Sequence, residues 1–261
     1  MADIGIQTSL HGIGVNGFGI TRDGDLVSKN RVIAPRSNKY IRMFDDFHGD
    51  TLNSDLYSTD VGSDGACVAA AINAQIGGVA RLVAGAGAGA DAAANLSLIR
   101  NQLQWKAANG GLYMEARIKI DAITAVALYV GFTDDISTND EFPVTLSGTT
   151  FTTNASDAVG FLFDTAATTD TIRLVGVKGN TDATHQDTSQ APVAATFITL
   201  RVEIGSDEIA NFFIDDLPVG TQMTGALTKT VALSPVIGVF SREAVIKNLD
   251  IDYIDVGMHR V

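Results

Sequence analysis

Residues 111–120 read Gly-Leu-Tyr-Met-Glu-Ala-Arg-Ile-Lys-Ile. From Leu112 to Ile120 every second side chain is apolar, and Tyr113, Glu115 and Arg117 stand between them. Alternation with a period of two is the pattern of a β-strand that buries one face and exposes the other. The segment therefore predicts a half-buried strand with its polar side chains on the solvent side.

Strand patterns continue through most of the remaining chain. Residues 125–133 are nearly all apolar and predict a central strand buried on both faces. Links rich in Asp, Thr, Asn and Gly predict turns between strands. The best helical candidate is a short segment within residues 89–104, which a Gly-Ala run precedes. Further strands are expected over 158–163, 172–178, 196–204, 209–214, 231–240 and 246–256. We expect an all-β, antiparallel two-sheet jelly-roll sandwich over residues 44–261.

The first 43 residues differ from this body in charge and composition. They are Gly-rich and carry six basic and three acidic residues, whereas residues 44–261 carry 12 basic and 27 acidic ones. Asp23-Gly24 predicts the turn of a small hairpin. The segment is too short to bury its own core, so we expect an extended basic arm that docks on an acidic surface, including a neighbouring copy of the body. The alternative is a solvated, flexible terminus.

Overall composition excludes several classes of protein. The 261 residues are 46% hydrophobic and carry a net charge of −12, which excludes a wholly disordered chain. The acidic balance argues against nucleic acid as a partner, because phosphate neutralisation needs clustered Lys and Arg. The single Cys67 excludes an intrachain disulfide. We expect no membrane span and no signal peptide, because neither pattern is present.

Four segments resemble one fold family. Residues 44–57 carry the apolar–Asp–Asp–Phe–x–Gly opening of concanavalin A-like lectin and glucanase domains. Residues 110–120 are similar to their Glu-Ala-Arg strand, residues 125–134 to the next strand, which ends in Gly-Phe-x-Asp, and residues 213–220 to a late hairpin. The resemblance covers roughly residues 44–256 and implies a concanavalin A-like jelly roll. It says less about function, because this fold carries lectins, glucanases and structural modules.

A second resemblance concerns the arm. Residues 22–27, Arg-Asp-Gly-Asp-Leu-Val, lie in Gly-rich sequence and resemble the opening of tailed-bacteriophage virion proteins of the capsid-decoration type. This resemblance implies a virion protein, assembled in the bacterial host cytoplasm as a homo-oligomer, most naturally a trimer. Its partner is then the major capsid protein or another virion protein.

The catalytic pattern of the glucanases is missing. Those enzymes carry a Glu-x-Asp-x-(x)-Glu string on one strand, with carboxylates about 5–5.5 Å apart for retention. Here no two Glu residues lie within four positions of each other, and the strand expected to correspond, 158–163, has no acid before Asp164. Glu115 is interpreted as a solvated surface carboxylate. The sequence thus predicts a protein that is not an enzyme.

No cofactor or metal is predicted. Residues 12–17 match Gly-x-Gly-x-x-Gly but lack the strand and helix of a dinucleotide site. The four His residues are far apart, and the acids Asp134, Asp135 and Asp140 lack the Asp-x-Asp-x-Asp-Gly loop of a calcium site. Whether an acidic loop holds Ca²⁺ stays open.

Three hypotheses for function remain. The first is a non-enzymatic capsid decoration protein that contacts the shell through Phe18, Ile20, Arg22, Arg31, Arg36 and Arg42. The second is a carbohydrate-binding, lectin-like module, for example for host surface glycans, with Trp105 and Tyr113 as sugar contacts. The third is a glycan hydrolase with a displaced catalytic pair. The first hypothesis is favoured because the catalytic string of the glucanases is missing and because the basic arm and the acidic body carry opposite charges.

Overall fold

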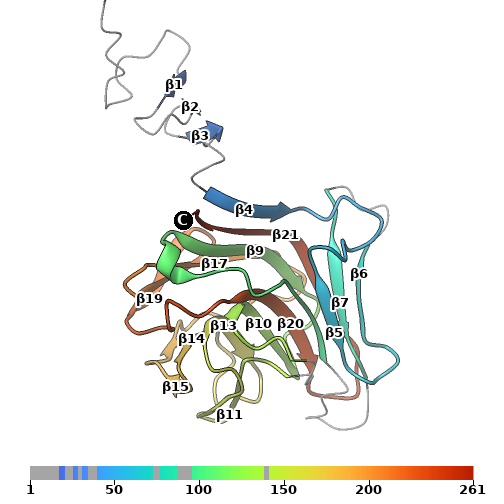
Figure 1. The fold of residues 1–261 in the computed structure, drawn as a ribbon. Coiled ribbons are helices and arrows are strands. Elements are labelled where there is room, and N and C mark those ends of the chain that lie inside the picture. The colour runs from blue at the N-terminus through green and yellow to red at the C-terminus, as the bar shows by residue number, and fades with distance from the viewer. Residues whose placement is uncertain are drawn as a thin grey trace, which may run out of the picture.

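The alternation of residues 111–120 becomes strand β9 (Leu112–Ile120), in which buried and half-buried side chains alternate along the whole strand. In the computed structural model, β9 is a central strand of one of two eight-stranded antiparallel sheets that pack face to face (Figure 1). The structure describes residues 40–72, 77–86, 96–137 and 141–260, with backbone alone for 96–98, and three short backbone strands before residue 40. The predicted all-β jelly-roll sandwich is confirmed.

The sheet that contains β9 lies uppermost in Figure 1, and we call it the upper sheet. Seven of its strands run in the order β19 (Leu217–Met223), β18 (Ala210–Ile214), β17 (Ile198–Ile204), β9, β21 (Lys247–His259), β7 (Ala80–Ala84) and β6 (Val68–Ala71). The eighth strand, β4 (Tyr40–Asp45), pairs with the C-terminal part of β21, while β7 pairs with its N-terminal part.

We call the other sheet the lower sheet. Seven of its strands run in the order β15 (Thr181–Asp182), β14 (Arg173–Lys178), β13 (Ala158–Asp164), β10 (Val126–Thr133), β20 (Ser234–Ser241), β8 (Leu96–Arg100) and β5 (Ser58–Val61). The eighth strand, β16 (Gln186–Asp187), pairs with β14 beside β15. Strands β10 and β13 are fully buried, and for β10 the continuous apolar run of residues 125–133 predicts this burial.

The main core lies between the two sheets. Met114 and Ile118 of β9 pack there with Phe161 and Phe163 of β13, and Phe161 meets Phe212 edge to face with ring centroids 5.4 Å apart. Burying one such side chain contributes about 1.5–3 kcal/mol relative to leaving it exposed. This core fixes the inward positions of each strand and so leaves the alternate positions facing outward.

A second core covers the outer face of the lower sheet. The hairpin of β11 (Val144–Ser147) and β12 (Thr150–Thr153) brings its apolar side chains onto this face, together with Phe142 and Ala155. They pack against Tyr129, Leu162 and Val177 of the sheet, and the rings of Tyr129 and Phe142 lie 6.2 Å apart. The outer face at β10, β13 and β14 is therefore buried rather than open to a ligand.

The helix predicted within residues 89–104 is wrong where the structure describes that segment. Residues 96–100 form β8, which pairs with β20 on one side and β5 on the other. Two ladders of hydrogen bonds, with Ile99 buried in the main core, outweigh the local helix propensity of the Ala-rich sequence. Helical structure in the described residues is limited to one 3₁₀ turn, Ala107–Asn109.

The N-terminal segment contains three short strands, β1 (Phe18–Ile20), β2 (Leu26–Ser28) and β3 (Arg31–Ala34). β1 and β2 pair antiparallel, in agreement with the predicted hairpin. The body's upper sheet begins at Tyr40 in β4, before the boundary expected at residue 44. Within the described residues, no helix has the length and apolarity needed to cross a membrane.

Candidate functional site

The outer face of the upper sheet carries a row of charged and aromatic side chains. Register pairs place Phe44 of β4, Asp255 of β21, Glu115 of β9, Arg201 of β17 and Phe213 of β18 side by side across five strands. We call these five residues the central row. Directly opposite residues have Cβ atoms roughly 4.5–5.5 Å apart. Glu115 and Asp255 are thus two carboxylates that face the same solvent from neighbouring strands.

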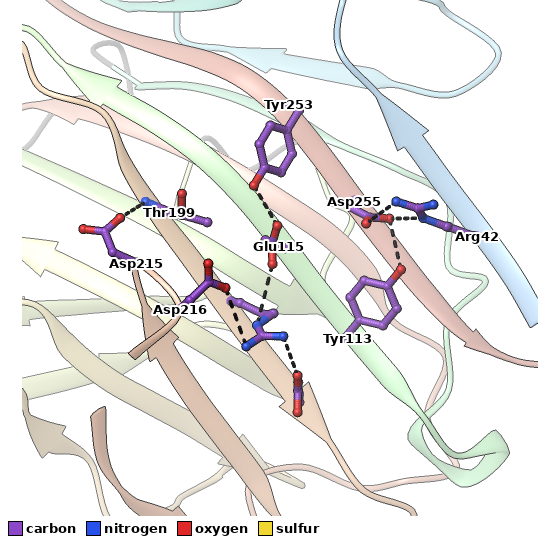
Figure 2. Close-up of polar contacts among 10 residues, drawn as sticks. Arg42, Tyr113, Glu115, Thr199, Asp215, Asp216, Tyr253 and Asp255 are labelled. Carbon is purple, nitrogen blue, oxygen red and sulfur yellow. Dashed lines mark hydrogen bonds and ion pairs between the residues drawn. The ribbon is translucent and has the colours of Figure 1, made fainter. Parts of the chain in front are cut away.

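Each of the two carboxylates accepts a hydrogen bond from a tyrosine. The Tyr253 hydroxyl donates to Glu115 Oε1 at 2.7 Å, and the Tyr113 hydroxyl donates to Asp255 Oδ1 at 3.1 Å (Figure 2). Asp255 also accepts from Arg42 Nε at 2.8 Å and from a terminal guanidinium nitrogen of Arg42 at 2.7 Å. Asp255 is therefore held by three donors from two strands, whereas Glu115 accepts one hydrogen bond from the residues that the structure describes.

The electrostatics of the site keep both tyrosines neutral. Burial, with the nearby Asp255 charge, raises the pKa of Tyr113 to about 12. Burial and the hydrogen bond to Glu115 also raise the pKa of Tyr253. The hydrogen bond with Asp255 raises the pKa of Arg42. At neutral pH the two phenols are thus fixed hydrogen-bond donors toward the two carboxylates.

Arg201 is the cation next to this pair. Its Nε lies 3.6 Å from Glu115 Oε2, and a terminal nitrogen lies 3.0 Å from Glu203 Oε1. The guanidinium also stacks over the ring of Phe213, 4.2 Å from its centroid. The second terminal nitrogen is 3.9 Å from Asp216, which belongs to the β18–β19 turn (Figure 2). One guanidinium thus faces three carboxylates.

The β18–β19 turn beside Arg201 has the two-residue hairpin geometry. Asp215 and Asp216 both have positive φ, 49° and 63°, and Ile214 pairs with Leu217. Positive φ at both central residues is the type I′ pattern, which Asp tolerates better than bulky residues do. Asp215 Oδ1 accepts the backbone N–H of Thr199 at 2.8 Å and so ties the turn to β17. This confirms the late hairpin expected from residues 213–220.

The strand expected to match the catalytic strand of glucanases carries no open acid. Of the outward positions of β13, only the last, Asp164, is acidic, and its side chain is 0% exposed. Two nitrogens of Arg242 donate to its oxygens, both at 2.5 Å, and the backbone N–H of Ala166 donates at 3.0 Å. Asp164 is a structural carboxylate beneath the β11–β12 hairpin.

The structure separates the residues predicted for the arm. Arg42 lies in β4 and is bound to Asp255 of the same chain. Phe18, Ile20 and Arg31 lie in β1 and β3, whose side chains are outside the described residues, as are Arg22 and Arg36 altogether.

Of the two residues predicted for sugar binding, the structure places one in the site and the other in the core. Tyr113 lies in the site on the central strand β9, and its hydroxyl donates to Asp255. Trp105 is 3% exposed and packs in the main core, so its indole offers no face to solvent.

Sequence reasoning missed the pairing of Glu115 with Asp255 and the role of Arg201. Glu115 was interpreted as solvated, and its position on the polar face of β9 was the available signal. No group of three or more His, Cys, Asp or Glu side chains in the described part of the chain could hold a metal ion. Asp140, one of the calcium candidates, falls outside those residues, and Asp134 Oδ1 accepts the backbone N–H of Asp157.

Comparisons with known proteins identify structural relatives. No family model matches the chain, and no curated protein matches it. Among solved structures, it is similar to the Bacillus licheniformis β-glucanase, with 12% identity, a TM-score of 0.56, and 82% of this chain and 97% of that chain covered. A Bacteroides ovatus glycoside hydrolase family 16 endo-glucanase gives 9% identity, a TM-score of 0.55, and 82% and 99% coverage. An endo-β-galactosidase from Clostridium perfringens is 11% identical with a TM-score of 0.56, and the match covers 85% of this chain and 63% of that chain.

These relatives overturn two predictions. The prediction of a non-enzymatic capsid decoration protein is contradicted, because the structural neighbours are glycoside hydrolases, and nothing in the comparisons supports a virion origin. The prediction rested on the missing catalytic string, and a glycan hydrolase with a displaced catalytic pair was the third hypothesis. At 9–12% identity, what the likeness shows is the fold, a concanavalin A-like jelly roll.

Proposed function

We propose that the protein is a glycan hydrolase whose catalytic acids are displaced to the outer face of the upper sheet. The observation that carries this proposal is the register pairing of Glu115 with Asp255 on adjacent central strands. The shared fold with β-glucanases and a β-galactosidase supports a glycan as the substrate class. The buried outer face of the lower sheet supports the displacement, since it leaves no room for a polymer there.

The chemistry of glycoside hydrolysis needs two acids close together. Hydrolysis of a glycoside takes one carboxylic acid that protonates the leaving oxygen and one carboxylate that attacks the sugar or activates water. Retaining enzymes hold the two about 5–5.5 Å apart. Opposite residues of an antiparallel pair have Cβ atoms at a similar spacing, roughly 4.5–5.5 Å. This spacing refers to Cβ atoms, and the two carboxylates turn to different tyrosines. The register pairing thus supports a pair of neighbouring acids and does not assign retention or inversion.

The surroundings assign a different role to each acid. Asp255, with Arg42 and Tyr113 donating to it, is the carboxylate that stabilises or attacks the positively charged sugar centre. Glu115, which accepts one hydrogen bond from Tyr253, is the group that exchanges a proton with the glycosidic oxygen. Exposed aromatic rings lie beside the pair: Phe44 is 52% exposed, and its ring centroid is 5.9 Å from that of Tyr253. Such rings suit the apolar face of a sugar ring.

The test is hydrolysis of a panel of soluble β-glucans and β-galactans by the purified full-length chain, followed as new reducing ends. Glu115→Gln and Asp255→Asn should each reduce the rate about 100-fold or more, because positioned acid–base groups contribute about 10²–10⁴-fold. Glu141→Gln is the matched control, since Glu141 is exposed in the segment that leads to the β11–β12 hairpin. Hydrolysis that survives both site variants would refute the assignment.

A second candidate is carbohydrate binding without hydrolysis. It is favoured by aromatic side chains on the same face of the sheet, because Tyr40 and Phe44 of β4 are exposed and Tyr113 of β9 is half-buried. Binding of a glycan that is lost in Tyr113→Ala, with no reducing ends released from any substrate of the panel, would identify this function instead.

A further inference from the structure

We propose that a depression next to the acid pair is a subsite for one uncharged hexopyranose unit of the glycan. This inference rests on the proposed function and deepens it by naming a binding position and the charge class of the sugar. The depression has a volume of about 270 Å³ and is lined by seven residues. They are Gly111, Leu112, Tyr113, Glu203, Ile204, Gly205 and Asn211.

The depression lies one step along the strands from the central row. Tyr113 of β9, Glu203 of β17 and Asn211 of β18 are register partners, so they form a second row across the same sheet. Each lies two positions from the neighbouring central-row residue, a distance of about 6.8 Å along an antiparallel strand. A sugar in the depression is thus next to a glycosidic bond that lies over Glu115 and Asp255.

Tyr113 joins the two places. Its hydroxyl donates to Asp255 Oδ1, while its residue forms a wall of the depression. Its ring is held on the other side by Gly257, where an added Cβ would lie 2.5 Å from Tyr113 Cε1. Any side chain at residue 257 would therefore displace this ring. The same tyrosine contacts the bound sugar and one catalytic carboxylate.

Two glycines lie among the lining residues, and neither has room for a side chain. At Gly111, φ is +59°, and an added Cβ would lie 2.7 Å from His259 Nε2. At Gly205 an added Cβ would lie 2.2 Å from Asp207 Oδ1. A side chain at either place would strain the backbone or its neighbour. The lining residues that carry an aromatic ring or a polar side chain are Tyr113, Glu203 and Asn211.

The two polar groups suit sugar hydroxyls. Glu203 has a side chain that is 43% exposed, and its carboxylate can accept from two neighbouring hydroxyls. Asn211 Oδ1 accepts from Gln222 Nε2 at 3.1 Å, and Asn211 Nδ2 makes no hydrogen bond with the residues that the structure describes. That amide can donate to a hydroxyl oxygen. An aromatic wall with a few convergent polar groups is the usual composition of a small-molecule site.

The charge around the depression selects against acidic sugars. Glu203, Glu115, Asp255 and Asp216 face this part of the sheet, and Arg42 and Arg201 are the guanidiniums paired with them. Four carboxylates against two guanidiniums leave an excess negative charge. A uronic acid residue would place a further carboxylate beside Glu203, so we assign the subsite to an uncharged sugar.

The test is binding of neutral oligosaccharides to the full-length chain by isothermal titration calorimetry. The probes are β-1,3-glucan, β-1,4-glucan, mixed-linkage glucan and β-1,4-galactan hexasaccharides. At least one probe should bind, and Glu203→Gln and Asn211→Ala should each weaken it about three- to tenfold, the range for losing one hydrogen bond. Asn248→Ala, which removes a contact to Asp121 elsewhere on the sheet, is the control and should not change the dissociation constant.

Charge selection is measured in the same experiment. A carboxymethylated form of the hexasaccharide that binds should show an affinity at least about tenfold lower than the neutral form at low salt. Equal binding of the two forms would overturn the charge assignment. Failure of all four probes to bind, or unchanged affinity in both Glu203→Gln and Asn211→Ala, would overturn the subsite.

Failure of the subsite is distinguishable from failure of the proposed function. Hydrolysis that needs Glu115 and Asp255 but is indifferent to Glu203 and Asn211 would leave the function standing and remove the subsite. Binding that needs Glu203 and Asn211, with no hydrolysis of any substrate, would support the subsite and refute the hydrolase.

Discussion

Arg42, at the edge of the upper sheet, donates two hydrogen bonds to Asp255 on the neighbouring strand, at 2.8 and 2.7 Å. Strand β4, which carries Arg42, is thereby attached to the candidate active site through a side chain as well as through its backbone ladder with β21. A guanidinium that binds both oxygens of a carboxylate fixes the rotation of that carboxylate. The orientation of Asp255 thus depends on a residue that sequence reasoning assigned to a docking arm.

Replacing Arg42 should therefore affect activity more than stability. In Arg42→Ala, loss of the fixed orientation of Asp255 should lower kcat for glycan hydrolysis about 10- to 100-fold. The side chain is 54% exposed, so the free energy of unfolding should change by about 1 kcal/mol or less. Arg42→Lys retains the charge but not the two-pronged geometry and should give an intermediate rate. Equal kcat in all three proteins would contradict a positioning role.

The tyrosines should resist ionisation. Burial raises the pKa of Tyr57, Tyr113, Tyr129 and Tyr253, to about 12 at Tyr113. A group with a raised pKa stabilises the fold below its unfolded pKa, about 10 for tyrosine, and this contribution is lost as pH rises toward its folded pKa. Tyrosinate absorbance should therefore lag behind that of the unfolded chain above about pH 10. Tyr113→Phe should remove one step near pH 12 from the tyrosinate absorbance titration, where Tyr113 ionises. An absorbance titration that is unchanged in this variant would contradict the burial of Tyr113 beside Asp255.

The second core should contribute strongly to stability. Phe142 is buried against Tyr129 and the rest of the lower sheet's outer face, so Phe142→Ala should lower the free energy of unfolding by about 3–5 kcal/mol. Ile136→Ala, an exposed position in the same connection, should stay within about 0.5 kcal/mol of the parent. Urea unfolding followed by circular dichroism measures both. A change below 1 kcal/mol at Phe142 would show that the hairpin is not packed as described.

The buried pair of Asp164 and Arg242 should be costly to break. Asp164→Asn removes the buried carboxylate charge that accepts two hydrogen bonds from Arg242 and should lower the free energy of unfolding by about 1.5–3 kcal/mol. Arg242→Met combined with Asp164→Leu removes both charges and should recover much of that loss. Chemical denaturation of the single and double variants checks this. A double variant less stable than Asp164→Asn would refute this expectation.

Sequence patterns predicted those strands and turns whose conformation is set by their own residues. The alternation of residues 111–120 became β9, the apolar run of 125–133 became β10, and Asp215 and Asp216 formed the expected hairpin turn. In each case the residues that carry the signal are also the ones that make the structure. The burial of β10 on both faces was also predicted, although its cause, the β11–β12 hairpin, was not.

The candidate site was beyond such signals because it depends on strand order. Glu115 and Tyr253 are 138 residues apart in sequence and become hydrogen-bonded neighbours only because β9 pairs with β21. The same cause defeated the helix prediction, since residues 96–100 take their conformation from β20 and β5. Periodicity says which side of a strand is polar, but it does not say which other strand lies beside it.

The hairpin of β11 and β12 makes the two broad sides of the molecule unequal, because it covers one of them. A two-sheet sandwich has two broad sides, and here one is sealed by the second core at β10, β13 and β14. In the hydrolase that we propose, the polymer therefore meets the upper sheet, on the side opposite this second core. The described body begins at Tyr40 in β4, so the N-terminal end of the body belongs to the same sheet as the proposed site and not to the covered one.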